Sequence, residues 1–261
     1  MRRFEDRIVM ITGAAHGIGL GIAERLAGEG AAVAVADVDA AAGERAAVRL
    51  AAGGTQAVAV TCDVTSGESV AAAVAAVVAR FGRLDVLVNN AGGGLNLPDL
   101  DELTDDDWHR QIDVTLMGVV RCVRAATPHL TRSPHGGNVV TVGSINGLAP
   151  FGSVAYSAAK AGLRNLTENL ASRCAADGVR FNLVAPGTIR TRAWDDQPDS
   201  LDRIASTIPL GRIGRPDDIA AAVAFLASGD AAWITGVTLP VDGGALLNAG
   251  RVFRDSAART R

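Results

Sequence analysis

Short apolar runs alternate with longer stretches of helical character along most of the chain. Seven runs have the length of strands, and most of them are apolar at nearly every position: Ile8–Ile11, Ala32–Ala36, Ala57–Thr61, Val86–Val88, Asn138–Val142, Val179–Val184 and Val237–Val241. Continuous apolar runs are typical of strands that helices bury on both faces. Several intervening stretches are long enough for crossover helices: Ile18–Glu29, Ser69–Arg80 and Tyr156–Ala176. The pattern therefore predicts an α/β fold, a doubly wound parallel sheet with helices on both faces.

The same alternation indicates a single domain over residues 1–250, because no linker rich in proline, glycine or serine interrupts it. A basic tail with weak periodicity follows over residues 251–261. This tail is either a frayed terminus or an arm that docks on a neighbouring subunit. The helical stretch Pro216–Ala227 leaves a similar choice, since its apolar face over Ala220–Leu226 suits the core or another subunit.

Composition narrows the functional classes. The chain has 261 residues, a net charge of −3 and 48% hydrophobic residues, which is typical of a globular protein and argues against a nucleic-acid partner. It has neither an apolar stretch long enough for a bilayer span nor a secretory signal, so we expect a cytoplasmic protein without a membrane partner. Cys62, Cys122 and Cys174 lack metal-ligand spacing, which predicts buried thiols and no metal site.

A glycine-rich segment follows the first predicted strand. Residues Thr12–Gly19 read T-G-x-x-x-G-x-G and lead into a helical pattern. Glycines allow a tight turn close to a pyrophosphate, whose charge is met by the amides and positive end of the next helix. We therefore predict a Rossmann-like dinucleotide site formed by Gly13, Ala15, His16, Gly17, Ile18 and Gly19. The His16 side chain is expected to face solvent without a chemical role.

The second predicted strand ends at a carboxylate, Asp37, 18 residues after Gly19. A carboxylate there accepts the ribose hydroxyls of NAD and repels the extra phosphate of NADP. The first nearby cation is Arg45, so the sequence favours NAD over NADP. The alternative is that Asp37 only caps the next helix. Asp63 and Val64, after the third strand, fall where an adenine ring would lie.

The chain's only tyrosine, Tyr156, and only lysine, Lys160, lie four residues apart on one predicted helical face. A phenol with a pKa of about 10 is a poor base near neutrality. One ammonium at about 5 Å contributes roughly 3 kcal/mol toward the phenolate at an effective dielectric of about 20. We therefore expect Lys160 to lower the pKa of Tyr156, with a positively charged nicotinamide supplying the remainder. Arginine could not serve as the same compact donor.

These segments resemble the motifs of the short-chain dehydrogenase/reductase family. The match runs from about residue 5 to about residue 247 and comprises Thr12–Gly19, Asn89–Gly92, Ser144, Tyr156–Lys160 and Pro186–Thr191. The resemblance implies that Tyr156 is the general acid/base, that Lys160 holds the nicotinamide ribose and that Ser144 stabilises the substrate oxygen. It also implies a homo-oligomer, a tetramer or dimer, and further cofactor contacts by Asn90, Ala91, Gly92, Pro186, Gly187, Ile189 and Thr191.

One position departs from the family pattern, because Thr115 stands where the family usually has asparagine. In the family, that residue supports a water that leads from the lysine to bulk solvent. A main-chain carbonyl, which threonine retains, chiefly holds this water, and the Thr115 hydroxyl can bond back to the carbonyl of Gln111. We expect a slower or differently routed proton relay rather than an inactive enzyme.

Substrate identity should lie in Gly93–Leu97, Ile145–Ser153 and Arg190–Ile208. The last segment resembles a short lid, whose Trp194 could stack on a ring and whose Ile204 and Ile208 face either a pocket or the domain body. Its acidic residues disfavour a strongly anionic substrate: Asp195, Asp196, Asp199 and Asp202.

The sequence thus favours an NAD-dependent enzyme that interconverts a small-molecule secondary alcohol and its ketone. The main alternative is a nucleotide-sensing protein on the same fold, with catalysis weakened or lost at Thr115. Retention of Tyr156, Lys160 and Ser144 argues against that alternative. An epimerase-like member fits poorly, because such proteins usually have the shorter T-G-x-x-G-x-x-G loop.

Overall fold

The fold is built on one parallel sheet of seven strands, in the order β3-β2-β1-β4-β5-β6-β7. The computed structural model describes residues 2–95, 97–194 and 198–247; the tail at 251–261 and Asp195 and Asp196 of the expected lid lie outside them. All seven predicted strands are confirmed: β1 Ile8–Thr12, β2 Ala32–Asp37, β3 Ala57–Thr61, β4 Val86–Asn89, β5 Asn138–Val142, β6 Arg180–Pro186 and β7 Thr238–Val241. The largest difference is in β6, which starts one residue later and ends two residues later than predicted.

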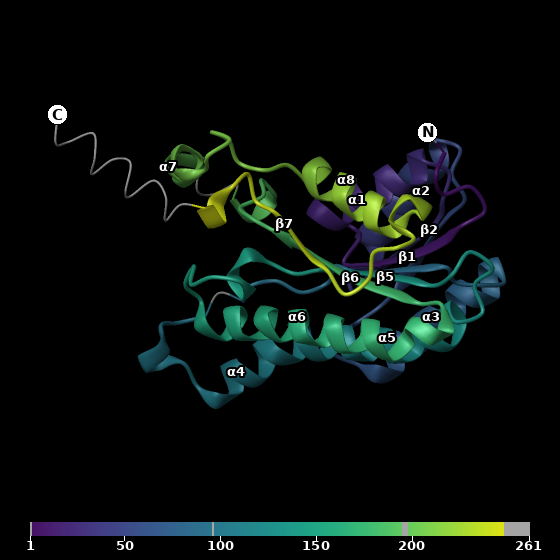
Figure 1. Ribbon diagram of the computed structural model, residues 1–261, viewed down its shortest axis with the longest axis horizontal. Coiled ribbons are helices and arrows are strands. Elements are labelled where there is room, and N and C mark those ends of the chain that lie inside the picture. Colours follow the sequence, from purple (N-terminus) through teal and green to yellow (C-terminus); the bar gives the residue numbers. More distant parts are fainter. Residues whose placement is uncertain (1, 96, 195–197, 248–261) are drawn as a thin grey trace.

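Helices cover both faces of this sheet, as the continuous apolar strands predict (Figure 1). In β1, Val9 and Ile11 belong to one core, and Ile8 and Met10 belong to the other. The first core is closed by α1 Gly17–Gly28, α2 Ala40–Ala52 and α8 Pro216–Ala227. The second is closed by α3 Gly67–Phe81, α5 Gly118–Leu130 and α6 Val154–Cys174. The predicted doubly wound fold is therefore correct.

Local capping explains where several helices start. Asp39 caps α2 by accepting from the Ala42 amide at 2.9 Å. Thr104 and Asp107 form a capping box at the start of α4 Asp105–Ile112, with three acidic residues in its first turn. The remaining helix, α7 Pro198–Thr207, lies within the segment expected to act as a lid.

The apolar face of α8 is core. Ile219 and Val223 are fully buried in the cluster that also contains the apolar residues of α1. The helices approach closely, because a Cβ atom at Gly21 would lie 2.8 Å from Cβ of Pro216. The buried positions of Ala220–Leu226 thus pack on the domain body, one of the two alternatives left by the sequence, while Phe225 on the same helix is 37% exposed.

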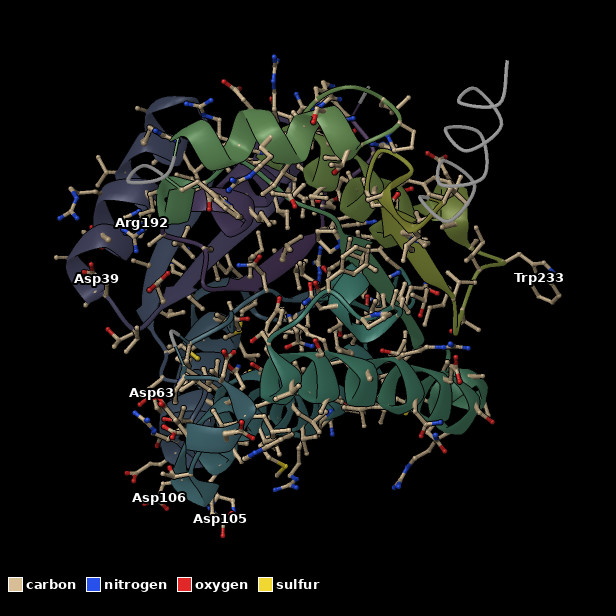
Figure 2. The ribbon with its side chains drawn as sticks, turned by 90° about the vertical axis from the view of Figure 1, so that its left-hand side faces the viewer. Asp39, Asp63, Asp105, Asp106, Arg192 and Trp233 are labelled. Atoms are coloured by element: carbon tan, nitrogen blue, oxygen red, sulfur yellow. The ribbon has the colours of Figure 1, made fainter. Side chains whose placement is uncertain are left out.

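The parallel strands bring the loops with predicted functions to one side of the molecule. Figure 2 shows Asp39, Asp63 and Arg192, which follow β2, β3 and β6, on one side, with Trp233 projecting from the opposite side. Trp233 precedes β7, and its side chain is fully exposed. Since the carboxyl ends of parallel strands share one edge, residues far apart in sequence can form a single cleft there.

The described residues can be searched for free cysteines, metal-ligand clusters and membrane-spanning helices. Cys62, Cys122 and Cys174 are free and buried, as predicted. Across the described ranges, no group of three or more His, Cys, Asp or Glu side chains is placed to hold a metal ion. None of the helices in these ranges combines the length and hydropathy needed to cross a bilayer.

Candidate active site and cofactor cleft

The turn between β1 and α1 has room only for glycine at two positions. Gly13 has a φ of +62°, and a Cβ atom there would lie 2.9 Å from Cα of Ala91. A Cβ atom at Gly19 would lie 2.2 Å from the Gly13 carbonyl oxygen. Side chains at either position would collide with backbone, so the turn can fold this tightly only with these glycines. The resulting cradle is the first feature that fits a dinucleotide.

The amino end of α1 is the second such feature. His16 occupies the capping position but makes no side-chain capping bond, and the first turn contains no acidic residue. The first amides of a helix lack partners within the helix and carry its positive end. Without a capping side chain or a competing carboxylate, this end can receive a pyrophosphate. His16 is half-buried, not fully in solvent as expected.

Asp37 does not cap the next helix, since that role belongs to Asp39. One carboxylate oxygen of Asp37 accepts from the Ala15 amide at 2.9 Å, and the other accepts from the Asp39 amide at 3.1 Å. Asp37 is therefore fixed beside the glycine-rich turn, where its negative charge can meet ribose hydroxyls. The structure excludes the capping alternative.

The residues after β4 and β3 border the same region. The Asn90 amide group donates to the carbonyl oxygens of Thr12 and Gly13 at 3.0 and 2.9 Å, which ties the end of β4 to the glycine-rich turn. Asp63 accepts from the hydroxyl and the amide of Thr65, and these bonds lower the pKa of Asp63. Val64, beside it, is buried against Gly118 of α5.

Ser144, Tyr156 and Lys160 border one cavity of about 570 Å³ at the carboxyl edge of the sheet. Ser144 follows β5, while Tyr156 and Lys160 lie one turn apart on α6. The cavity reaches Ile18 at the start of α1 and runs along the loop after β6, past Asn90, Gly92, Pro186, Gly187, Ile189 and Thr191. The structure thus brings these candidates together, whereas the other predicted residues do not border the cavity: Gly13, Ala15, His16, Gly17, Gly19, Asp37, Asp63, Val64, Ala91 and Thr115.

Lys160 is the most deeply buried of these side chains, with 5% of its surface exposed. Its Nζ atom donates to the Val142 carbonyl oxygen at 2.9 Å and lies 5.5 Å from the centre of the Tyr156 ring. Burial lowers the pKa of Lys160 to about 8. An ammonium in this position loses its hydration and keeps the Val142 carbonyl oxygen as its acceptor, which explains why the pKa of Lys160 is lowered.

The expected effect of Lys160 on Tyr156 is wrong for the protein groups alone. Burial raises the pKa of Tyr156, and hydrogen bonding with Ser144 acts in the opposite direction. The ammonium lies 5.5 Å from the ring centre and donates to Val142, and the pKa of Tyr156 is shifted by burial and by Ser144, not by Lys160. Lowering the pKa of Tyr156 therefore requires further positive charge in the cavity, as an oxidised nicotinamide would bring.

Thr115 makes a different contact from the one expected. It lies in a π-helical segment, Asp113–Met117, and is 1% exposed. Its hydroxyl oxygen accepts a hydrogen bond from Nε2 of the Gln111 side chain at 2.7 Å. The expected bond, in which the hydroxyl donates to the main-chain carbonyl of Gln111, is not the one found. The fully buried Gln111 amide also binds the carbonyl of Gly93 and the amide of Leu95, both at 2.9 Å. The pair thus anchors the loop beside Tyr156.

Apolar side chains form the wall of the cavity opposite the cofactor candidates. Phe151, Trp194, Ile204 and Ile208 all line it. Ile204 and Ile208 therefore face the pocket, one of the two alternatives that their helical spacing left open. No arginine borders this cavity among the described residues, so its substrate side offers little to hold a strongly anionic group.

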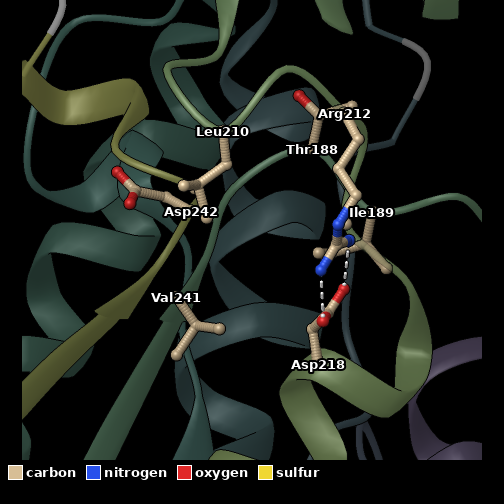
Figure 3. A pocket seen from close by; sticks show the side chains of 9 residues that line it. Thr188, Ile189, Leu210, Arg212, Asp218, Val241 and Asp242 are labelled. Atoms are coloured by element: carbon tan, nitrogen blue, oxygen red, sulfur yellow. Dashed lines mark hydrogen bonds and ion pairs between the residues drawn. The ribbon is translucent and has the colours of Figure 1, made fainter.

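Sequence reasoning missed an ion pair behind the loop after β6. Arg212 and Asp218 are joined by two bonds, each 2.7 Å, and line a small cavity of about 100 Å³ together with Ile189. Figure 3 shows this pair beside Ile189. The Arg212 guanidinium lowers the pKa of Asp218 to about 2. The adjacent backbone pairs Gly214 with Thr188 and Arg190. The pair fixes this loop, and the only sequence signal was Pro216 followed by acidic residues at a helix start.

Comparisons with known proteins agree with this arrangement. A family model described as enoyl-(acyl carrier protein) reductase matches residues 13–245. The chain is 39% identical over 251 residues to meso-2,3-butanediol dehydrogenase of Serratia marcescens, which covers 95% of this chain and 98% of that protein. It is 43% identical over 243 residues to cis-4-hydroxycyclohexanecarboxylate dehydrogenase of Sinomonas cyclohexanicum, and the match covers 92% of this chain and 97% of that protein.

A solved structure of a candidate short-chain alcohol dehydrogenase from Sinorhizobium meliloti shares the fold with a TM-score of 0.87 and 34% identity, covering 94% of this chain and 98% of that one. Residues from each of the motifs found in the sequence border one cavity, with Ile18 the member from the glycine-rich turn, and the relatives match along nearly the whole length. The chain is therefore an oxidoreductase that belongs to the short-chain dehydrogenase/reductase family.

Proposed function

We propose that this protein uses NAD to interconvert a secondary alcohol and its ketone at Ser144, Tyr156 and Lys160. One observation carries the proposal: the chain's sole tyrosine and sole lysine meet a serine at a cavity that reaches Ile18, in the first turn of the uncapped helix α1. A nucleotide sensor, the alternative function, has no use for a phenol buried beside an ammonium.

Each residue has a chemical task in this proposal. Tyr156 Oη takes the proton of an alcohol, or returns it to a ketone, at the substrate oxygen. The Ser144 hydroxyl donates to the same oxygen and stabilises the negative charge that develops there. Lys160 adds positive charge beneath the phenol ring and offers ammonium hydrogens to a ribose. NAD, when bound, supplies the acceptor for the two electrons and the hydrogen that leave the carbinol carbon.

Residues of the cleft would hold the cofactor in a defined direction. The pyrophosphate belongs at the turn from Gly13 to Gly19, and the adenosine ribose belongs at Asp37. The nicotinamide end belongs near Tyr156 and the loop from Pro186 to Thr191. The named relatives act on hydroxyl compounds, a butanediol and a hydroxycyclohexanecarboxylate. Together with the apolar wall, these names favour a small, mainly apolar secondary alcohol.

The proposal is tested by following NADH absorbance during incubation with a panel of secondary alcohols, both linear and cyclic. We expect turnover with at least one alcohol, and the reverse reaction with the matching ketone. NADH binding, seen as a fluorescence change, without turnover of any alcohol or ketone would instead support the nucleotide sensor.

Replacing Asp37 by serine should shift the cofactor preference toward NADP. The variant loses a charged acceptor for the ribose hydroxyls and the repulsion of the extra phosphate. A hydrogen bond to a charged group contributes about 1.5–3 kcal/mol, so we expect the NAD/NADP ratio of kcat/KM to fall roughly 10- to 150-fold. Asp39→Ser is the matched control, because serine still caps α2. An unchanged ratio in Asp37→Ser would contradict the assignment.

Replacing Thr115 by asparagine should speed the proposed proton relay. The family-type amide would restore the usual support for a water near Lys160, so we expect a higher kcat and a shifted pH–rate profile. Steady-state rates between pH 6 and 10 measure both. If kcat and the profile stay as in the wild type, Thr115 has no part in a relay and serves only to hold Gln111.

The expected cytoplasmic location and the expected homo-oligomer, a tetramer or dimer, stay predictions.

A further inference from the structure

The Ser144 hydroxyl is bonded in both directions to its neighbour Asn146. The backbone N–H of Asn146 donates to Ser144 Oγ at 3.1 Å, and Ser144 Oγ donates to the side-chain oxygen of Asn146 at 3.2 Å. A serine hydroxyl carries one proton and can donate only one strong hydrogen bond at a time. While that proton lies on Asn146, Ser144 does not donate to Tyr156 or to a substrate oxygen.

The orientation of the Asn146 amide is fixed by two further groups. Its Nδ2 atom donates to the Gly152 carbonyl oxygen at 3.3 Å and to Ser157 Oγ at 3.4 Å. Ser157 Oγ in turn donates to the same Gly152 oxygen at 2.6 Å. A carbonyl oxygen can only accept, so Nδ2 must face Gly152 and Oδ1 must face Ser144. An amide that cannot turn presents a permanent acceptor to the Ser144 proton.

We propose that Asn146 is a positioning residue, whose side-chain oxygen holds the Ser144 proton until the substrate oxygen becomes the stronger acceptor. This rests on the proposed function, in which Ser144 donates to that oxygen. A charged acceptor forms a hydrogen bond roughly twice as strong as a neutral one. The proton therefore stays on the neutral amide in the ground state and turns to the substrate as negative charge develops. A bond gained only at that stage raises kcat rather than affinity.

The sole tyrosine offers a direct readout that needs neither cofactor nor substrate. A hydrogen bond donated by Ser144 lowers the pKa of Tyr156, so that pKa reports whether the serine proton points to Tyr156 or to Asn146. We expect Asn146→Ala, which frees the proton, to lower the pKa of Tyr156, and Ser144→Ala to raise it. Adding Asn146→Ala to Ser144→Ala should cause no further change, because Asn146 acts through Ser144. A single carbon-13 tyrosine resonance, or phenolate absorbance, follows the titration.

Turnover provides the second readout. In Asn146→Asp, a charged acceptor retains the serine proton, so we expect kcat to fall about tenfold, which corresponds to about 1.4 kcal/mol, with KM nearly unchanged. The matched control is Asn169→Asp, an exposed amide on α6 that contacts Asn165 and does not line the cavity. Its kcat should equal that of the wild type.

The outcomes separate this proposal from the proposed function. No shift in the pKa of Tyr156 in Asn146→Ala, or the same shift with and without Ser144, overturns the role of Asn146. So does a wild-type kcat in Asn146→Asp. If the wild type turns over no alcohol, the reaction is wrong, while the titration of folded Asn146 and Ser144 variants still decides whether Asn146 controls the Ser144 proton.

Discussion

Tyr156→Phe is expected to abolish most turnover while leaving the cofactor cleft intact. In the proposed function, the phenol oxygen exchanges a proton with the substrate oxygen while Ser144 stabilises that oxygen. Loss of a general acid/base typically lowers the rate by about 10²- to 10⁴-fold, and we expect kcat to fall by that amount. Reduction of NAD with the best alcohol of the panel, and oxidation of NADH with the matching ketone, measure the effect.

The control for this variant is binding rather than activity. The glycine cradle, the uncapped end of α1 and Asp37 lie away from the phenol oxygen, so the affinity for NADH should change little. Fluorescence titration of NADH and thermal unfolding establish that the variant is folded and loaded. Turnover within threefold of the wild type would mean that another group carries the proton, and the proposed function would need a different acid/base.

Lys160→Met is expected to stabilise the protein while it removes activity. Burial lowers the pKa of Lys160 from 10.5 to about 8, which corresponds to a cost of roughly 3 kcal/mol for keeping the ammonium charged in the folded state. Methionine has a similar length and no charge, but it leaves the Val142 carbonyl oxygen without its donor, a loss of about 1 kcal/mol. We expect a net gain of about 1–2 kcal/mol in the free energy of unfolding at pH 7.

The pH dependence of stability gives this prediction its sign. Below pH 8, Lys160 is protonated in the folded and in the unfolded protein, so the free energy of unfolding is reduced by the full cost of burying the ammonium. Between pH 8 and 10 the folded state releases the proton while the unfolded state retains it, so wild-type stability should rise with pH. The methionine variant should lack this rise. Urea unfolding at pH 7 and pH 9.5 measures both.

The control for Lys160→Met is Arg164→Met on the same helix. Arg164 is an exposed cation paired with Glu168 at 3.0 Å, and its replacement should change the free energy of unfolding by less than about 1 kcal/mol. If Lys160→Met is less stable than the wild type at pH 7, the buried ammonium is better stabilised than its burial indicates. A parallel pH dependence in the two proteins would lead to the same conclusion.

The fold and the principal site residues could be predicted because their signals are local. Strands such as β1 and β2 are almost entirely apolar, so hydrophobicity alone locates them in the sequence. The turn from Gly13 to Gly19 depends on a backbone that only glycine can adopt at such close approach. The spacing of Tyr156 and Lys160 places them on one helical face whatever surrounds that helix.

The partners of those residues could not be predicted in the same way, because they depend on groups brought together across the fold. The sequence by itself determined the sheet, the glycine cradle and the identity of the chemical groups. Only the tertiary structure decided that Lys160 binds Val142, that Thr115 binds the Gln111 side chain and that Arg212 pairs with Asp218. It also decided that burial raises the pKa of Tyr156, since desolvation depends on every element packed around a side chain and no spacing along the chain measures it.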